Sequence, residues 1–540
     1  MTRGAVACLM SSLLGVVGCG SDEKEPEVEQ PWDGSVTPQE EQSDWVDTGP
    51  YAACKALATR LGSCGATQDS FDLSGCRRET LGNLDRQGIY RAKLRLDALT
   101  DDGTTYVTQG HGSFRFDENG KPSSVYGYPF VEDQSQVTED TFFIKGLNVV
   151  QLPGASPRDV TYMFVGCEAP SSQVLTGCFS VCSRNTQNIM GTFHAERMTW
   201  GPLERRSAGG LRPLSESPVE LGSPADVYVA KDHAYVVSLN KAGKDGGLTI
   251  FDVTDRNHPI FKGSISIPGD NYWNGVWAKG DALYVASSVS GLLVFDISNP
   301  AEPTLLRSLP GGPALNVHTV LVDGDRLYAM APSPNRETLI FDVATPTEPR
   351  LLGRYVIPGL YSYPHDAFSF GGRLYINHGY DGYQVADVSD PANGQLLGAY
   401  GTDRRYGTFS HHSAVGVFGG HTLAFEGGEG LGAHLRVLKV DDPANIVKVG
   451  EFKLRDFTSI HNLQLVGERL YIAWYQEGVR VLDVSNPTKP RMVAWYNTFH
   501  DTNPNSGEGL FEGALGIRVP GDGYVYVADD VRGLLVFKEL

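Results

Sequence analysis

Short apolar runs recur along the second part of the chain, separated by turns rich in Gly, Pro, Asn and Asp. One such run returns, with variations, about every 45 residues, and this period of short strands and turns is typical of a β-propeller with one four-stranded blade per copy. Its copies begin at Gly247, Gly291, Glu337, Gly382, His434 and Gly478, with a shortened seventh at Gly533.

The third copy serves as the template for a blade. Its sequence predicts four strands, which begin at His318, Arg326, Thr338 and Pro349. The runs are almost continuously apolar because blades pack face to face, which buries both faces of each sheet. An Asp ends the third strand of most copies, where its carboxylate can accept backbone N–H bonds from the following turn. Lys439 and Lys538 replace it in two copies, which argues against a catalytic carboxylate.

The two ends of the repeat region predict how the ring closes. The seventh copy stops after its third strand at Leu540, whereas the segment from Ser217 upstream of the first copy resembles a fourth-strand phrase. We expect Val219 to Leu221 to form the outer strand of the last blade, because a strand from the other end of the chain removes an open edge. The predicted fold is therefore all-β, with a seven-bladed propeller over residues 212–540.

Residues 51–203 are expected to form a small β-rich domain braced by disulfides. The segment from Tyr51 to Cys64 has helical spacing, and the chain after Gly88 has strand patterns. Six cysteines lie here, an even number that suits disulfides in an exported protein: Cys54, Cys64, Cys76, Cys167, Cys178 and Cys182. Zinc is the alternative, but no second short Cys or His pair completes a four-ligand set beside Cys178 and Cys182.

The N-terminus predicts export. Residues 1–18 have the charge and apolar stretch of a signal peptide, and Val16-Val17-Gly18-Cys19 resembles a bacterial lipobox. That resemblance implies a lipid on Cys19 and a place in the cell envelope, at the outer membrane or cell surface. A plain secretory signal with a chance Cys is the alternative. Residues 19–50 carry ten acidic residues and one Lys, so we expect a disordered acidic tether.

Charge and apolar run length exclude two classes of partner. The net charge of −19 repels phosphate backbones, so nucleic acid is not an expected partner. No internal apolar run reaches the roughly 20 residues that span a bilayer, so the lipid is the only expected contact with a membrane.

The repeat phrases resemble a known family. Leu292-LVFDISNP, Val479-RVLDVSNP and Leu248-TIFDV are similar to the bacterial LVIVD-repeat propellers, and an Arg-Leu-Tyr flank recurs at Arg326, Arg373 and Arg469. This resemblance implies the propeller fold and export. It implies no particular activity, because none is established for the family.

Histidines recur in register at the expected starts of inner strands, which meet at one mouth of the central channel. His318, His365, His412 and His461 are the candidate ligands of a transition metal, because imidazole suits zinc, copper, iron and nickel. His411 is the neighbour of His412, and Asp366 and Asn462 are candidate supporting groups. The other copies have Ala225, Asn274 and Ala514 at this place. The alternative is that these histidines are structural or bound to water.

No sequence motif of a known catalytic machinery is present: the chain lacks a G-x-S-x-G elbow, an H-E-x-x-H helix and a P-loop. No catalytic residue is therefore assigned. Trp273, Arg404, Arg405 and Tyr406 lie between predicted blades and are candidate rim contacts. We expect a monomeric, surface-anchored binding or scaffold module for an envelope protein or glycan. The alternative is a metal-dependent oxidase or hydrolase working at the histidine end of the channel.

Overall fold

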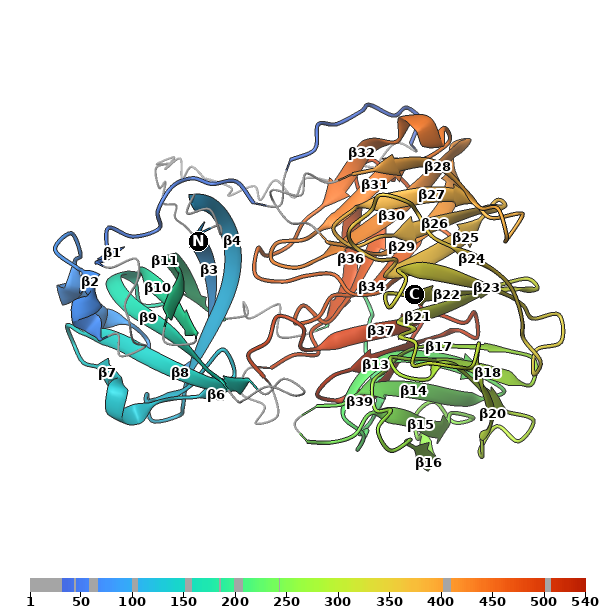
Figure 1. Cartoon of the computed structure of the whole chain (residues 1–540), viewed down its shortest axis with the longest axis horizontal. Helices are drawn as coiled ribbons and strands as arrows, with labels where there is room; N and C mark the ends of the chain where they lie inside the picture. The colour runs from blue at the N-terminus through green and yellow to red at the C-terminus, as the bar shows by residue number, and fades with distance from the viewer. Residues whose placement is uncertain are drawn as a thin grey trace, which may run out of the picture.

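The computed structural model shows two β-rich parts side by side (Figure 1). It describes residues 32–42, 45–57, 67–99, 105–150, 158–183, 186–198, 207–241, 243–401, 409–500 and 507–540. The helical elements in these ranges are short 3-10 turns: η1 (Gln68–Ser70), η2 (Arg78–Asn83), η3 (Glu132–Gln134) and η5 (Pro443–Asn445). In the same ranges, no helix has the length and apolar character needed to cross a membrane.

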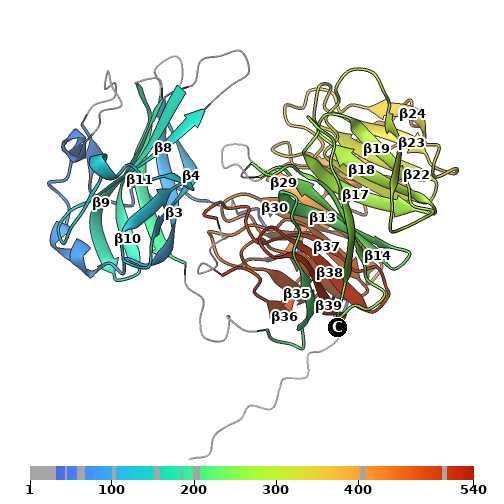
Figure 2. The same cartoon turned by 90° about the horizontal axis from the view of Figure 1, so that it is seen from below.

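The first part is a nine-stranded antiparallel sheet in the order β6-β5-β4-β3-β11-β10-β9-β8-β7. Its strands are β3 (Gly88–Leu99), β4 (Thr105–Phe116), β5 (Pro122–Val125), β6 (Tyr128–Pro129), β7 (Gln136–Val137), β8 (Phe142–Val150), β9 (Arg158–Ser171), β10 (Val174–Ser183) and β11 (Thr186–Arg197). The sheet curls, as Figure 2 shows from below, and Phe130, just after β6, bridges Gly146 of β8. Aromatic side chains such as Phe114 and Phe164 fill the inside of the curl.

Two disulfides fasten the segment before this sheet onto it. They join Cys54 to Cys178 and Cys76 to Cys167, and Cys182 is disulfide-bonded as well. Cys64 lies outside the described residues.

The helix expected from Tyr51 to Cys64 is wrong for the part that the structure describes. Lys55–Ala56 is a short strand, β1, which pairs with β2 (Phe71–Asp72). The neighbouring Cys54 is buried and bonded to the sheet, so a tertiary constraint overrides the helical spacing.

The second part is a ring of seven four-stranded antiparallel sheets, as predicted. Blades 1 to 3 are β13 (Ser223–Ala230), β14 (His233–Leu239), β15 (Gly247–Asp252), β16 (Ile260–Ile265); β17 (Trp273–Lys279), β18 (Ala282–Ser287), β19 (Gly291–Asp296), β20 (Thr304–Leu309); and β21 (Thr319–Asp323), β22 (Arg326–Ala331), β23 (Glu337–Asp342), β24 (Arg350–Tyr355). Blades 4 and 5 are β25 (Asp366–Phe370), β26 (Arg373–Asn377), β27 (Tyr383–Asp387), β28 (Gln395–Tyr400); and β29 (Phe409–Phe418), β30 (His421–Glu429), β31 (Leu435–Lys439), β32 (Val447–Phe452). Blades 6 and 7 are β33 (Leu463–Val466), β34 (Arg469–Ala473), β35 (Val479–Asp483), β36 (Arg491–Tyr496); and β37 (Ala514–Arg518), β38 (Tyr524–Asp529), β39 (Gly533–Lys538) with β12 (Pro213–Ser217). Each inner strand contacts the next one, and β37 contacts β13, so the ring is closed around a central channel.

The closure of the ring by an N-terminal strand is confirmed, but the strand differs from the one predicted. β12, which pairs with β39, covers Pro213–Ser217 and not Val219 to Leu221. Residues 218–222 are needed to carry the chain from the outside of blade 7 to the inner strand β13. Upstream of β12, Leu211 is fully buried in the core shared by blades 6 and 7.

Of the expected acidic tether, residues 32–41 lie against the propeller, whereas Asp47 forms an ion pair with Arg95 of the first sheet. Trp32 packs 6.5 Å from the ring of His421, and the Gln39 backbone N–H donates to the Lys448 carbonyl at 2.8 Å. The Glu41 carboxylate accepts from Arg436 Nε at 3.2 Å. We call residues 32–41 the N-terminal strap. It runs along the blade that contains β32 before the chain reaches the first sheet (Figure 1).

The first sheet contacts propeller loops that lead into inner strands. Lys93 forms an ion pair with Asp456, and its ammonium lies 5.0 Å from the centre of the Phe457 ring. The Gly127 N–H donates to Glu508 Oε2 at 3.2 Å. These loops precede β33 and β37, so the first sheet lies at the face of the propeller where the inner strands begin.

Candidate functional site

One side chain per blade occupies equivalent positions at the start of the inner strands. These seven residues, which we call the channel ring, are Ala225, Asn274, His318, His365, His411, His461 and Leu515. In blades 1, 2, 5 and 7 the residue is a bulge that interrupts the pairing of the inner strand, which places Leu515 in the ring where Ala514 was expected. In the other three blades the backbone N–H of the histidine donates to the second strand.

The ring brings together three of the four histidines that were predicted, and His411 takes the place of His412. The ring centres of His365 and His411 are 4.2 Å apart. His412 is one residue further along β29, and its Nε2 lies 3.6 Å from Asp366 Oδ2. The reason is the position of the bulge, which in blade 5 falls at His411, further from the hairpin turn than in blades 1 and 2, a difference that residue counting could not detect.

The hydrogen bonds of the ring fix the tautomers of two imidazoles. His411 Nδ1 donates to the carbonyl of His461 at 2.9 Å, and His461 Nδ1 donates to the carbonyl of Leu515 at 2.9 Å. A carbonyl oxygen can only accept, so both protons are on Nδ1. The Nε2 lone pairs of His411 and His461 are therefore available to a ligand.

On the other side of the ring the contacts are between nitrogens. His318 Nε2 lies 2.8 Å from His365 Nε2, and the Asn274 amide donates to the same His318 nitrogen at 3.2 Å.

Burial keeps these imidazoles neutral. It lowers the pKa of His318 and of His461 to about 4, and it lowers the pKa of His365 and His411 well below the ordinary value. Neighbouring histidines add to the effect on the pKa of His318, His365 and His411. At pH 7 the imidazoles of the ring are therefore uncharged, and their unprotonated nitrogens can donate an electron pair to a ligand.

A carboxylate stands beside the ring. Glu429 Oε1 lies 3.6 Å from His411 Nε2 and accepts a hydrogen bond from the Tyr475 hydroxyl. Burial raises the pKa of Glu429 to about 7. Tyr475 adopts φ 34°, a left-handed conformation that is unusual for a residue with a side chain and that is often found at functional sites.

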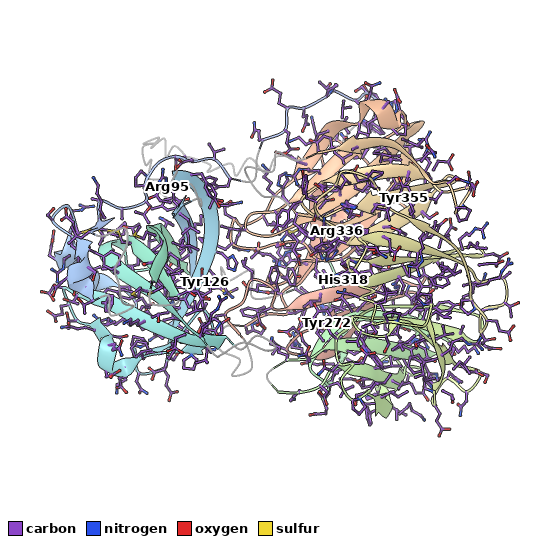
Figure 3. All side chains as sticks on the ribbon, viewed as in Figure 1. Arg95, Tyr126, Tyr272, His318, Arg336 and Tyr355 are labelled. Atoms are coloured by element: carbon purple, nitrogen blue, oxygen red, sulfur yellow. A yellow bond between two sulfur atoms is a disulfide. The ribbon has the colours of Figure 1, made fainter. Side chains whose placement is uncertain are left out.

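Aromatic side chains surround the ring at the face from which the inner strands start. We call them the aromatic mouth: Tyr272, Tyr363, Tyr380, Phe409, Tyr475 and Phe511. Phe409 lies 5.0 Å from His365 and Tyr475 lies 5.0 Å from His461, both measured between ring centres. Tyr380 and Phe511 are 52% and 48% exposed, so the mouth offers apolar surface to solvent. Figure 3 labels Tyr272 and His318 near the middle of the propeller.

A cavity of about 310 Å³ lies in the channel and is lined by three ring histidines, His365, His411 and His461. Arg518 reaches it from blade 7, with its guanidinium 4.5 Å from the Trp277 ring centre. Asp226 also lines the cavity, and burial raises the pKa of this carboxyl to about 6.

The two groups expected to support the site also line the cavity, namely Asp366 and Asn462. Burial raises the pKa of Asp366 to about 8.

The predicted rim is wrong where it can be examined. Trp273 is fully buried, and its indole N–H donates to Asp270 Oδ1 at 3.1 Å. It is the first residue of β17 and part of the core between blades 1 and 2, where the sequence suggested a loop. The other candidates fall outside the described residues, as does the lipidation candidate: Arg404, Arg405, Tyr406 and Cys19.

The sequence did not place Glu429 or the aromatic mouth at the channel. These residues come from loops and strand ends of several blades, and no spacing in the chain links them. One further group, Cys54, Cys76 and Cys167, has sulfurs close enough for a metal, but all three form disulfides.

Comparison with known proteins agrees with the repeat pattern. The family model described as LVIVD repeat matches residues 221–266, 272–309 and 460–498. No curated protein matches the chain. Among solved structures, the computationally designed Ika8 protein is 11% identical over 61% of this chain and 99% of its own, with a TM-score of 0.42. The WD40 β-propeller domain of Doa1 is 10% identical over 61% of this chain and 98% of its own, with a TM-score of 0.45. The chain is thus a seven-bladed β-propeller protein that carries LVIVD repeats in its first, second and sixth blades.

Proposed function

We propose that the protein is a binding module of the bacterial cell envelope and that its ligand binds at the aromatic mouth. The observation that carries this proposal is the exposure of Tyr380 and Phe511 beside a channel whose walls are fixed by a closed ring of blades. Exposed aromatic side chains on loops of a rigid scaffold supply much of the energy of binding sites at a low cost in conformational entropy. A propeller built of repeats suits a binding or scaffold role.

The ligand that we propose is an envelope glycan or an exposed segment of an envelope protein. Both present apolar surface together with hydrogen-bonding groups. Tyrosine rings combine apolar area with a polar hydroxyl, and Glu429 adds an acceptor next to them.

A lipid on Cys19 would hold the protein at the membrane and keep the mouth accessible to neighbouring envelope components. The lipobox-like sequence before Cys19 supports this part of the proposal. It is tested by fractionation of the producing bacterium after labelling with a palmitate analogue. Wild type should carry label in the membrane fraction, and Cys19→Ser should lose both the label and the membrane association. An unlabelled wild type that is released as a free periplasmic protein would refute the anchor.

The binding proposal is tested with the chain from residue 20 as bait in an envelope extract. The Tyr380→Ala/Phe511→Ala double variant removes the exposed part of the mouth. The control is Ile260→Ala/Phe261→Ala, which removes two side chains of similar exposure, 59% and 57%, from the outer strand of blade 1. Wild type and control should recover the same glycan or protein, and the mouth variant should not. If all three recover the same set, the mouth is not the binding site.

The second candidate is a metal-dependent enzyme, either an oxidase or a hydrolase. The specific observation in its favour is the convergence of four histidines in the channel ring.

A further inference from the structure

We propose that His365 and His411 of the channel ring, together with the neighbouring Glu429, bind one divalent first-row transition-metal ion, with His318 and His461 beside them. Each of the first three residues offers one ligand atom, and these atoms all lie within 4.8 Å of one another. The proposal concerns the ring itself and does not depend on which ligand the aromatic mouth binds.

The distances suit a common ion. Nitrogen ligands at about 2.0–2.1 Å from a tetrahedral zinc lie about 3.3–3.4 Å from one another. The His411 Nε2 to Glu429 Oε1 distance is 3.6 Å, close to that value, and the ligand atom of His365 lies within 4.8 Å of both.

His365 has a nitrogen that hydrogen bonding does not satisfy. Its Nδ1 is buried and makes no hydrogen bond of normal geometry among the described residues, and the backbone of His411 is the polar group that acts on this imidazole. If His365 Nε2 carries the proton and donates to His318, then Nδ1 is a buried lone pair without a donor. If Nδ1 carries the proton, then two lone pairs face each other at 2.8 Å, because the Asn274 amide already donates to His318 Nε2. With the Asn274 amide nitrogen facing His318, either tautomer of His365 leaves one polar atom unpaired, which an ion would resolve.

The nitrogen of His411 that faces the Glu429 carboxylate also lacks a hydrogen-bond partner among the described residues. His411 is 1% exposed, and its Nε2 has no hydrogen-bond partner among the described residues. Its proton is on Nδ1, which donates to the His461 carbonyl, so a lone pair points toward Glu429. A lone pair and a carboxylate attract each other only when a cation or a proton lies between them.

The surroundings resemble those of a supported metal site. Metal-binding histidines usually donate their second ring N–H to a carbonyl or carboxylate, which holds the imidazole in place. The Nδ1 atoms of His411 and His461 do so here, and the Tyr475 hydroxyl holds Glu429. Tyr475 is thus a positioning residue for the site.

The donor set selects the class of ion. Several neutral imidazoles with one carboxylate suit zinc, copper, nickel or iron. Calcium and magnesium prefer sets made of oxygen ligands. For a given nitrogen and oxygen site, affinity rises from cobalt through nickel to copper and is lower again for zinc, which predicts the order of competition. The channel cavity next to the ring leaves room for a water molecule or a small ligand on the ion.

The test uses the chain from residue 20, without a polyhistidine tag, stripped with chelator and then given cobalt, nickel, copper or zinc separately. After desalting, elemental analysis should find one ion per chain, and the cobalt form should show visible ligand-field bands. Glu429→Gln removes the charge of a ligand and should weaken binding by at least the roughly 10- to 100-fold that loss of a supporting partner costs, and His411→Ala should abolish it. The control is His258→Ala. The His258 side chain is 83% exposed and lies in the turn between β15 and β16 of blade 1.

Folding is monitored by circular dichroism and thermal unfolding. If His411→Ala does not fold, the half-buried His318→Asn replaces it, and that variant should lower the affinity and shift the cobalt bands. The proposal is overturned if the folded wild type retains no ion. It is also overturned if folded Glu429→Gln and folded His318→Asn retain the ion as tightly as the His258→Ala control does.

Discussion

The aspartate that ends the third strand of most blades holds the turn that follows it. In five blades its Oδ1 accepts the backbone N–H two residues later, at 2.7 to 3.0 Å. These residues are Asp252, Asp296, Asp342, Asp387 and Asp483. The hydrogen bonds therefore agree with the structural role predicted for this aspartate. Where Lys439 takes this place, Asp442 accepts the N–H of Ala444 instead.

Asp483 allows a quantitative test of this role. Besides the Ser485 N–H, it accepts from Arg469 at 2.7 Å. Asp483→Ala should lower the free energy of unfolding by about 1–3 kcal/mol, because hydrogen bonds to a charged group are lost. Asp483→Asn keeps an acceptor for the turn and should cost less. Urea denaturation of the three proteins measures both differences. Equal costs for Ala and Asn would mean that the turn bond contributes nothing.

The same carboxylate makes stability depend on pH in the acid range. Burial opposes the effect, but hydrogen bonds from Ser485 and Arg469 lower the pKa of Asp483 to about 2. A lowered pKa in the folded state stabilises the protein above the unfolded value of about 3.9, and this contribution is lost as the pH falls from about 4 to about 2. The stability difference between wild type and Asp483→Asn should therefore shrink over that interval. A difference that stays constant from pH 5 to pH 2 would contradict the assignment.

Residue identities in the channel could be predicted only in part. The three histidines His318, His365 and His461 follow from a constant offset within the repeat, as do Ala225 and Asn274, so five of the seven ring positions were predicted. His411 sits on a bulge that lies further from its hairpin turn than the bulges at Ala225 and Asn274 do, and residue counting cannot detect this difference. Trp273 was misplaced because an Asn-Tyr pair before it resembles a loop, whereas the indole is the start of an inner strand.

Among the elements, β12 determines whether the ring is closed. It is the outer strand of blade 7, and Arg532 of that blade forms an ion pair with Glu216 of β12. Just before it, Leu211 is inserted among side chains of blades 6 and 7.

A prediction for the segment that leads into β12 compares how much stability is lost when each of two leucines is replaced by alanine. Leu211→Ala should lower the free energy of unfolding of the propeller by about 2–5 kcal/mol, because a fully buried leucine leaves a cavity. Leu305→Ala on the outer strand of blade 2, where the side chain is 43% exposed, should change it by less than about 0.5 kcal/mol. Chemical denaturation followed by tryptophan fluorescence measures both. Similar small effects would show that the segment before β12 does not hold the ring together.

How well an element was predicted depended on whether the repeat contained it. The blades were found because each copy repeats the same strands and turns. β12 was placed too far along the chain, since its phrase is degenerate and the length of the crossing to β13 was not considered. Lys55–Ala56 was read as helix because the constraint from the Cys54–Cys178 bond acts over a sequence separation of 124 residues, far beyond any local pattern.

For the whole molecule, the covalent links divide the two parts. All cysteines after Cys19 precede residue 200, and the described disulfides brace the first sheet. Calorimetry should show two transitions, and reductant should lower the temperature of only one of them, because cross-links stabilise by restricting the unfolded chain. The propeller transition should not move. A single transition that shifts as a whole would mean that the two parts unfold together.

The first sheet lies at the face of the propeller where one end of the channel opens. Asp456, Phe457 and Glu508, which contact the first sheet, belong to loops that lead into the inner strands of blades 6 and 7. The same face carries the aromatic mouth, because the ring residues begin those strands. A large ligand that enters the channel from this face therefore has to fit beside the first sheet.

The N-terminal strap has a mechanical consequence. A pull on the chain before residue 32 is transmitted first to the contacts of Trp32, Gln39 and Glu41 with the blade of β32, and only afterwards to the first sheet. The load is therefore carried along the rim of the propeller, where contacts are spread over several residues and share it. The described route of the chain therefore predicts that this blade bears the force first. The disulfide-linked sheet bears it only after the contacts of the N-terminal strap have broken.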